Sequence, residues 1–169
     1  NHDGMIDGVW LVNSAGIKAY SSDDFWAFTY WDINNPDASS GYDVENPMAV
    51  PYCSASYKFL ENGGYNGKPD SHTMIHETGH LMGIEDYYTY DKGGWGPAGG
   101  GDMMDQNVGD HDAFTKTLYG WTNPYYVTGD AEITIKPFQE NGDCIIVKNG
   151  WIGHAFDEYL IIEFYTPTV

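Results

Sequence analysis

The sequence contains no arginine and only seven lysines, against 25 aspartates and glutamates, which gives a formal net charge of −18. Proteins that bind nucleic acid or an anionic membrane surface need clustered basic side chains to contact the phosphates. We therefore expect no nucleic-acid partner and no attraction to anionic membranes. The surplus of carboxylates instead suits a secreted, soluble protein whose surface attracts cations.

Long apolar runs are also missing, so we expect no membrane insertion. The chain starts at Asn1 and shows no charged-then-apolar leader, which predicts a mature secreted product or an excised fragment. We also expect the protein to act as a monomer.

Cysteine is scarce as well. Cys53 and Cys144 lie far apart in the sequence and form either one disulfide or two buried thiols.

Aromatic residues and glycine are plentiful: 14 tyrosines, six tryptophans and 21 glycines predict a loop-rich α+β domain that buries aromatic rings. Short apolar runs bounded by Ser, Asn, Gly and Pro predict the strands. The expected strands are residues 8–13, 25–31, 52–59, 125–127, 131–135, 144–147 and 159–164. The first of these has the continuous apolar pattern of a strand that is buried on both faces.

Two helices are expected between these strands. Pro69 and polar capping residues precede apolar positions at helical spacing, so the first helix should occupy residues 69–83 and end at Gly83. The second should begin after His111 and Asp112 and stop at Gly120. Residues 91–110, with seven glycines, should form a long irregular connection, and a connection of that length is usually functional.

The first helix carries the strongest chemical pattern in the chain. His76 and His80 are four residues apart, so both imidazoles lie on one helix face and can bind one metal ion. Zinc in a catalytic site takes three protein ligands and keeps one position for water. Because Gly83 can reverse the chain, Asp86 is the predicted third ligand.

Glu77 is the predicted general base of this site. It is adjacent to His76 but poorly placed to become a ligand itself, whereas its carboxylate can reach a water on the open side of the metal. It would take a proton from that water and transfer it to the leaving amine of a cleaved peptide bond.

The stretch from His76 to Met104 resembles the metzincin metallopeptidases. It has the extended pattern H-E-x-x-H-x-x-G-x-x-D, then a glycine-rich loop and the sequence GDMMD at 101–105. The aspartate followed by tyrosines, together with LYGWTNP at 118–124, is most similar to the secreted bacterial peptidases of the immune-inhibitor-A type. Snapalysin-like peptidases share the aspartate.

This resemblance implies a zincin catalytic domain with a mixed twisted sheet, an active-site helix and a methionine turn. It assigns zinc to His76, His80 and Asp86 and the general base to Glu77. It places Met104 beneath the zinc, with Met103 as the alternative. The catalytic domain would span residues 1–124, followed by a β-rich extension at 125–169.

Weaker patterns concern calcium and the tyrosines after Asp86. Asp3 and Asp7 lie at the spacing of a calcium loop, although an ordinary Asp-Gly turn explains the same residues. A second calcium could be held near Asp102, Asp105 and Asp110. Tyr87 and Tyr88 could stabilise an oxyanion or simply pack.

The overall expectation is a secreted zinc endopeptidase that acts on proteins or peptides. Its substrate would pair as an extended strand with an edge strand near Tyr52–Tyr57. Two alternative functions would use the same three zinc ligands. One is a zinc-stabilised binding module, and the other is a catalytically silent fragment of a larger secreted protein.

Overall fold

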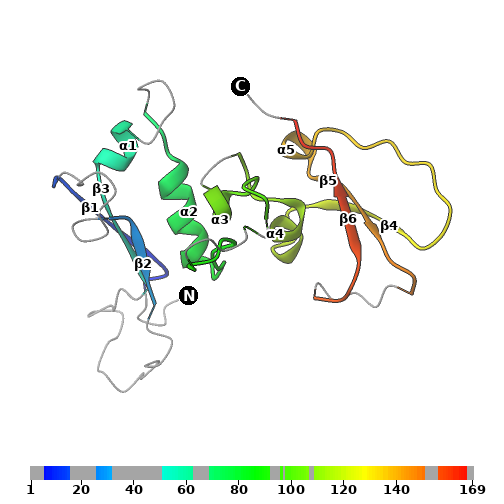
Figure 1. The fold of residues 1–169 in the computed structure, drawn as a ribbon, viewed down its shortest axis with the longest axis horizontal. Coiled ribbons are helices and arrows are strands. Elements are labelled where there is room, and N and C mark those ends of the chain that lie inside the picture. The colour runs from blue at the N-terminus through cyan, green and yellow to red at the C-terminus, as the bar shows by residue number, and fades with distance from the viewer. Residues whose placement is uncertain are drawn as a thin grey trace, which may run out of the picture. The chain divides into compact units, whose positions relative to one another are not determined.

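The computed structural model describes residues 6–15, 26–31, 51–62, 69–91, 96, 98–106, 109–150 and 156–166. The chain divides into two compact units, Asn1–Thr89 and Tyr90–Val169. Each described part contains one three-stranded sheet with short helices, so the fold is mixed α+β, as expected (Figure 1). The predicted boundary at residue 124, between a catalytic domain and a β-rich extension, is a division by function rather than by compactness and stays a prediction.

The sheet of the first unit contains β1 (Val9–Asn13), β2 (Phe28–Tyr30) and β3 (Tyr52–Ser56). β3 lies in the centre, parallel to β1 and antiparallel to β2. The expectation that a substrate pairs with β3 is therefore wrong, because both of its edges already bind neighbouring strands.

β1 is less buried than its apolar sequence predicts. Leu11 and Val12 lie on opposite faces of the strand, and their exposed fractions are 51% and 50%. The physical reason is the position of β1 at one edge of the described sheet, while helix α2 (His72–Leu81) packs on β2 and β3. Apolar composition alone does not distinguish an edge strand from a central one.

The strand expected at 52–59 ends early. β3 stops at Ser56, and helix α1 (Lys58–Asn62) begins two residues later. The Ser56 hydroxyl accepts a hydrogen bond from the Lys58 backbone N–H at 3.2 Å, a local bond that favours a turn over a continued strand.

Helix α2 confirms a helix within the predicted range 69–83, but it is shorter and runs from His72 to Leu81. At its start, the Asp70 carboxylate accepts a hydrogen bond from the His72 N–H at 3.0 Å. At its end, Gly83 has a left-handed φ of +90°. The Gly83 N–H donates to the His80 carbonyl at 2.8 Å and the Ile84 N–H donates to the Gly79 carbonyl at 3.1 Å. This pair of bonds defines a Schellman turn.

The second unit contains a sheet in the order β4 (Asn123–Val127), β5 (Asp143–Val147) and β6 (Leu160–Glu163). β4 and β5 are parallel, and β5 and β6 are antiparallel. Helices α3 (Met103–Gln106), α4 (Ala113–Leu118) and α5 (Phe138–Asn141) complete the described part. Its core consists of the buried side chains of Ala113, Phe138 and Cys144, with Ile161 packed against them.

Helix α4 also confirms its prediction. The Asp112 carboxylate caps it by accepting a hydrogen bond from the Thr115 N–H at 2.8 Å, and Gly120 follows it with φ +70°. The connection at 91–110 is less irregular than expected, because α3 lies within it.

The strand expected at 131–135 is absent. Ile133 and Ile135 are half-buried between exposed neighbours, so the alternating pattern correctly indicated one buried face. However, a strand also needs a neighbouring strand to bind its backbone, and the described sheet has none beside these residues.

The two cysteines are free thiols. Cys53 lies in β3 and Cys144 in β5, and both are fully buried. Of the two alternatives open from the sequence, the structure contains the buried thiols. Within the described residues, no helix is both long and apolar enough to cross a membrane.

Asp102 connects α3 to the cap of α4. Its carboxylate accepts the Met104 N–H at 2.6 Å and the Asp112 N–H at 2.7 Å, and the side chain is almost fully buried. Burial, with a smaller contribution from the nearby carboxylates of Asp112 and Asp105, raises the pKa of Asp102 to about 6 despite the two N–H donors.

We expect Asp102 to make the protein less stable as the pH rises from 4 to 6. A carboxyl whose pKa is higher in the folded protein than in the unfolded chain favours the folded state while it is protonated, and this contribution is lost as it ionises. A shift of about two units corresponds to at most about 3 kcal/mol in the free energy of unfolding.

The measurement is urea unfolding of wild type and Asp102→Asn at pH 4, 5 and 6. The unfolding free energy of the wild type minus that of Asp102→Asn should fall with rising pH, because only the wild type can ionise at this position. Asp130→Asn, at an exposed position, is the matched control and should follow the wild type. A constant difference for Asp102→Asn would contradict the prediction.

Candidate metal centre

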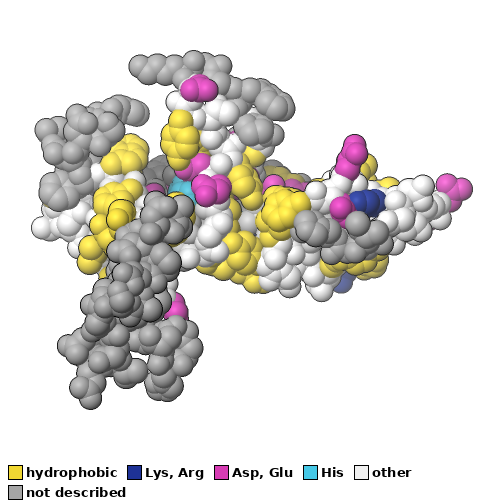
Figure 2. All heavy atoms as spheres, turned by 90° about the horizontal axis from the view of Figure 1, so that it is seen from below, with side chains coloured by type: hydrophobic (Ala, Val, Ile, Leu, Met, Phe, Trp, Pro, Cys, Tyr) yellow, Lys and Arg dark blue, Asp and Glu magenta, His cyan; other side chains and the backbone are white. Residues whose placement is uncertain are grey.

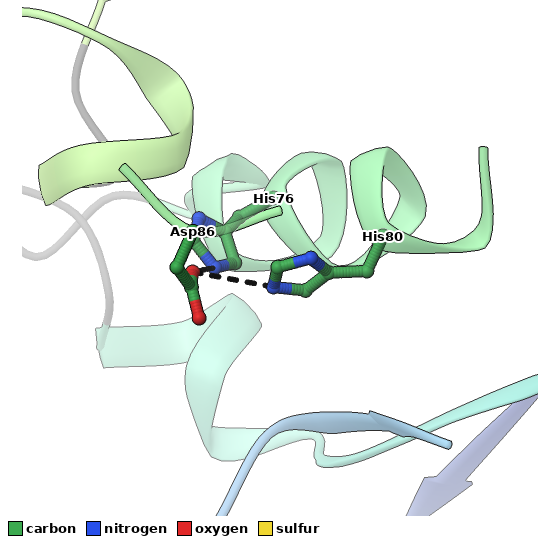
Figure 3. Close-up of side chains that lie close together, drawn as sticks. All are labelled: His76, His80 and Asp86. Carbon is green, nitrogen blue, oxygen red and sulfur yellow. Dashed lines mark ion pairs between the residues drawn. The ribbon is translucent and has the colours of Figure 1, made fainter. Parts of the chain in front are cut away.

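Three side chains of the first unit converge on one point (Figure 3). His76 and His80 extend from the same face of α2, and Asp86 reaches them from the segment after the helix. Asp86 Oδ1 is 3.0 Å from His76 Nε2 and 3.3 Å from His80 Nε2. The structure therefore brings together all three ligands that the sequence predicted.

The Schellman turn at Gly83 explains how Asp86 reaches the helix. The turn reverses the chain directly after α2, so the residues that follow run back beside the last helical turn. Ile84 is buried there and anchors the returning segment. A side chain at residue 83 would oppose the left-handed backbone, which explains the need for glycine.

The orientation of His80 is set by a hydrogen bond on the far side of its ring. Its Nδ1 lies 2.6 Å from the Ile84 carbonyl oxygen, which can only accept, so Nδ1 carries the hydrogen. In the neutral ring, Nε2 then presents its lone pair toward Asp86 and His76. Metal-binding histidines are commonly oriented by such a bond.

Trp31 supports His80 from the sheet side. Its indole N–H donates to the His80 backbone carbonyl at 3.0 Å, and the two rings meet edge to face with centroids 5.3 Å apart. His76 and His80 also meet edge to face, at 4.7 Å. These contacts limit the rotation of the imidazoles.

The donor set fits a divalent transition metal such as zinc. Two imidazole nitrogens and one carboxylate oxygen lie within 4.8 Å of one another. Zinc binds such atoms at about 2.0–2.2 Å, so two ligand atoms of a tetrahedral site are separated by roughly 3.3 Å. The separations of 3.0 and 3.3 Å from Asp86 to the histidines match this geometry. Calcium, by contrast, prefers a shell of oxygen ligands.

A proton can compete with the metal at this site. Burial lowers the pKa of His80, but the hydrogen bonds to Asp86 and to the Ile84 carbonyl outweigh it, so the pKa is higher than usual. In the metal-free protein, His80 can thus form an ion pair with Asp86. The same geometry accommodates either a proton or a metal ion.

Glu77 lies beside the three ligands and is buried. Burial raises the pKa of its carboxyl, while a hydrogen bond from Thr29 and the charges of His76 and His80 lower it less strongly. Its Oε2 atom is 2.8 Å from the Thr29 hydroxyl oxygen. A buried carboxylate with a raised pKa next to possible metal ligands is suited to accept a proton.

Figure 2 shows a small area of histidine surface with acidic side chains near it. His76 and His80 expose only 5% and 7% of their surface. The ligands are thus mostly shielded from solvent, which strengthens their interaction with a bound cation.

Met103 and Met104 are both buried in α3 of the second unit. Their burial does not distinguish between them, and the role of Met104 beneath a metal stays a prediction. Tyr87 and Tyr88 are half-buried directly after Asp86, and their roles also stay predictions.

The calcium predictions find little support in the described residues. Asp3 lies outside them, and Asp7 is exposed. Asp102 and Asp105 accept backbone N–H groups, including that of Gly100 at 2.6 Å, and Asp110 pairs with Lys116. These carboxylates do not form a second group of converging ligands within the described part of the chain.

Sequence reasoning missed several residues that contact helix α2, among them Thr29, Trp31 and Cys53. Thr29 stands between Phe28 and Tyr30, so the alternation of β2 directs its side chain to the opposite face. A threonine inside an aromatic run was the available signal. Its target could not be identified without the packing of α2 on the sheet.

No family model matches the chain, and no curated protein or solved structure is similar enough to it to count as a match.

We expect the protein to bind one zinc ion per chain through the three converging side chains. His76→Ala, His80→Ala and Asp86→Ala should each weaken zinc binding on the order of 100-fold or more, because each removes a ligand. Isothermal titration calorimetry with zinc would measure the affinities.

His72→Ala is the matched control for these variants. His72 lies on the same helix, and it pairs with Asp70 rather than with the converging group. It should bind zinc like the wild type. Equal affinities in all four variants would show that the group holds no metal and is an ion-pair cluster.

Proposed function

We propose that the protein is a zinc-dependent endopeptidase. The observation that carries this proposal is the convergence of His76, His80 and Asp86 beside the buried carboxylate of Glu77. A structural metal site needs only ligands, whereas a hydrolytic site also needs a base beside them. When bound, zinc would polarise the carbonyl group of the scissile peptide bond and make a water molecule more acidic.

Glu77 is the general base in this proposal. Its position adjacent to His76 places its carboxylate next to the ligands without making it one of them. It removes a proton from the attacking water and then delivers this proton to the leaving amine.

The substrate would pair with β2 rather than with β3. β2 is an edge strand of the described sheet, and the side chain of Thr29 on this strand contacts Glu77. A peptide added to this edge in an extended conformation would run close to the catalytic carboxylate. The proposed substrate-binding edge is therefore β2, in place of the strand expected near Tyr52–Tyr57.

We further propose that the protein has a metzincin-like fold of the immune-inhibitor-A type, with Met104 in the methionine turn. In this proposal it is secreted and monomeric. The proposed fold is supported by the order of the motif along the chain: two histidines on α2, a left-handed Gly83, and Asp86 on the returning segment. The proposal treats calcium near Asp3 and Asp7 as secondary, since the zinc chemistry does not require it.

Glu77→Gln should bind zinc with nearly wild-type affinity but lose cleavage by roughly 10²–10⁴-fold, because the amide cannot accept the proton. The measurement is cleavage of casein by purified protein with zinc, with and without a chelator, alongside zinc content by mass spectrometry. Chelator should abolish the wild-type activity.

Glu85→Gln is the control, since Glu85 is exposed in the turn after the same helix. It should cleave casein like the wild type. A fully active Glu77→Gln protein would refute the assigned base. A wild type that binds zinc but cleaves nothing would favour the zinc-stabilised binding module instead.

A further inference from the structure

Thr29 is in direct contact with the proposed catalytic base. It lies in the middle of β2, and its hydroxyl oxygen is 2.8 Å from Glu77 Oε2 and 2.9 Å from the Glu77 backbone oxygen. The Cys53 sulfur lies 3.1 Å from the same hydroxyl. One side chain from the sheet thus reaches both the backbone and the carboxylate of one helical residue.

The hydrogens in this group can be assigned from donors and acceptors. The Cys53 thiol lies 3.2 Å from the Glu77 backbone oxygen and can donate to it. The single hydrogen of the Thr29 hydroxyl is then available for Glu77 Oε2, which can only accept when the carboxyl is ionised. Each acceptor receives a hydrogen, and the carboxylate receives the stronger, charge-assisted bond.

This bond restricts the orientation of the base. A glutamate has several rotatable bonds, and fixing one carboxylate oxygen removes most of that freedom. With Oε2 bound to Thr29, Oε1 is the oxygen that remains available to a water molecule. Orientation of this kind can contribute strongly to catalysis, because the base must be within hydrogen-bond reach of the proton.

We propose that Thr29 is a positioning residue that holds the Glu77 carboxylate in its productive orientation and couples it to the substrate-binding edge strand. This inference rests on the proposed peptidase function. The inference gives β2 a second role. The strand that pairs with the substrate also orients the base, so the substrate and the base are positioned by the same strand.

Helix docking does not account for the contact with the carboxylate. α2 is also held on the sheet by two tryptophan N–H groups, from Trp10 to the Thr78 hydroxyl at 3.2 Å and from Trp31 to the His80 carbonyl at 3.0 Å. Those bonds end on the helix backbone or on a surface hydroxyl. Thr29 donates to the reactive group itself.

The test compares Thr29→Val and Thr29→Ser. Valine keeps the branched shape and removes the hydroxyl, whereas serine keeps the hydroxyl and removes the methyl group. Thr29→Val should lower kcat for peptide cleavage about tenfold, the effect of losing one hydrogen bond to a charged group. KM and zinc content should stay unchanged, and Thr29→Ser should recover most of kcat.

Trp10→Phe controls for loosened docking of α2, because it removes the bond to Thr78 and leaves Glu77 untouched. It should keep the wild-type kcat. An active wild type with a fully active Thr29→Val would overturn the positioning role while leaving the peptidase function intact. A fall in kcat with Trp10→Phe equal to that with Thr29→Val would also overturn it, since docking would then explain both.

A second measurement does not depend on cleavage. In metal-free protein, Thr29→Val should lower the midpoint of thermal unfolding more in the wild type than in a Glu77→Ala background, where the carboxylate is missing. Equal shifts would overturn the contact itself. A wild type that cleaves no peptide would refute the peptidase function and with it the catalytic role of Thr29, whereas unequal shifts would still establish the contact.

Discussion

The reversal of the chain at Gly83 is the constraint on which the candidate metal centre depends. Two histidines on one helix face supply two ligands, and a third must return from outside the helix. Gly83 permits this return through its left-handed backbone, and it brings Asp86 within 3.3 Å of both imidazoles. The same turn presents the Ile84 carbonyl to His80 Nδ1, so it also selects the nitrogen that faces the ligand group.

The contacts that hold α2 on the sheet also shape the site. Cys53, Thr29 and Trp31 all project from the sheet or its end toward the helix: Cys53 and Thr29 contact Glu77, and Trp31 donates to the His80 carbonyl. Helix packing and the geometry of the candidate metal centre are therefore coupled in this unit. A substitution in β2 or β3 that shifts the helix would move the candidate ligands and Glu77 together, without touching any of them.

The buried carboxylates of the two units have different kinds of partner. In the first unit, Asp86 lies against two imidazoles and Glu77 interacts with their charges, and this arrangement suits a cation. In the second unit, Asp102 and Asp105 accept backbone N–H groups and order the segment around α3. The composition shows only that the chain is acidic. The partners of each carboxylate decide whether it serves as a ligand, a base or a cap.

Local patterns in the sequence determined a helix within residues 69–83, the cap at Asp112 and the three converging side chains, because helical spacing, capping and a glycine turn act over a few residues. The sequence could not determine which strand is central in each described sheet or that residues 131–135 pair with no strand of these sheets. It also could not determine that Thr29 contacts Glu77. These depend on pairing and packing between segments far apart in the chain, and only the tertiary structure brings those segments together.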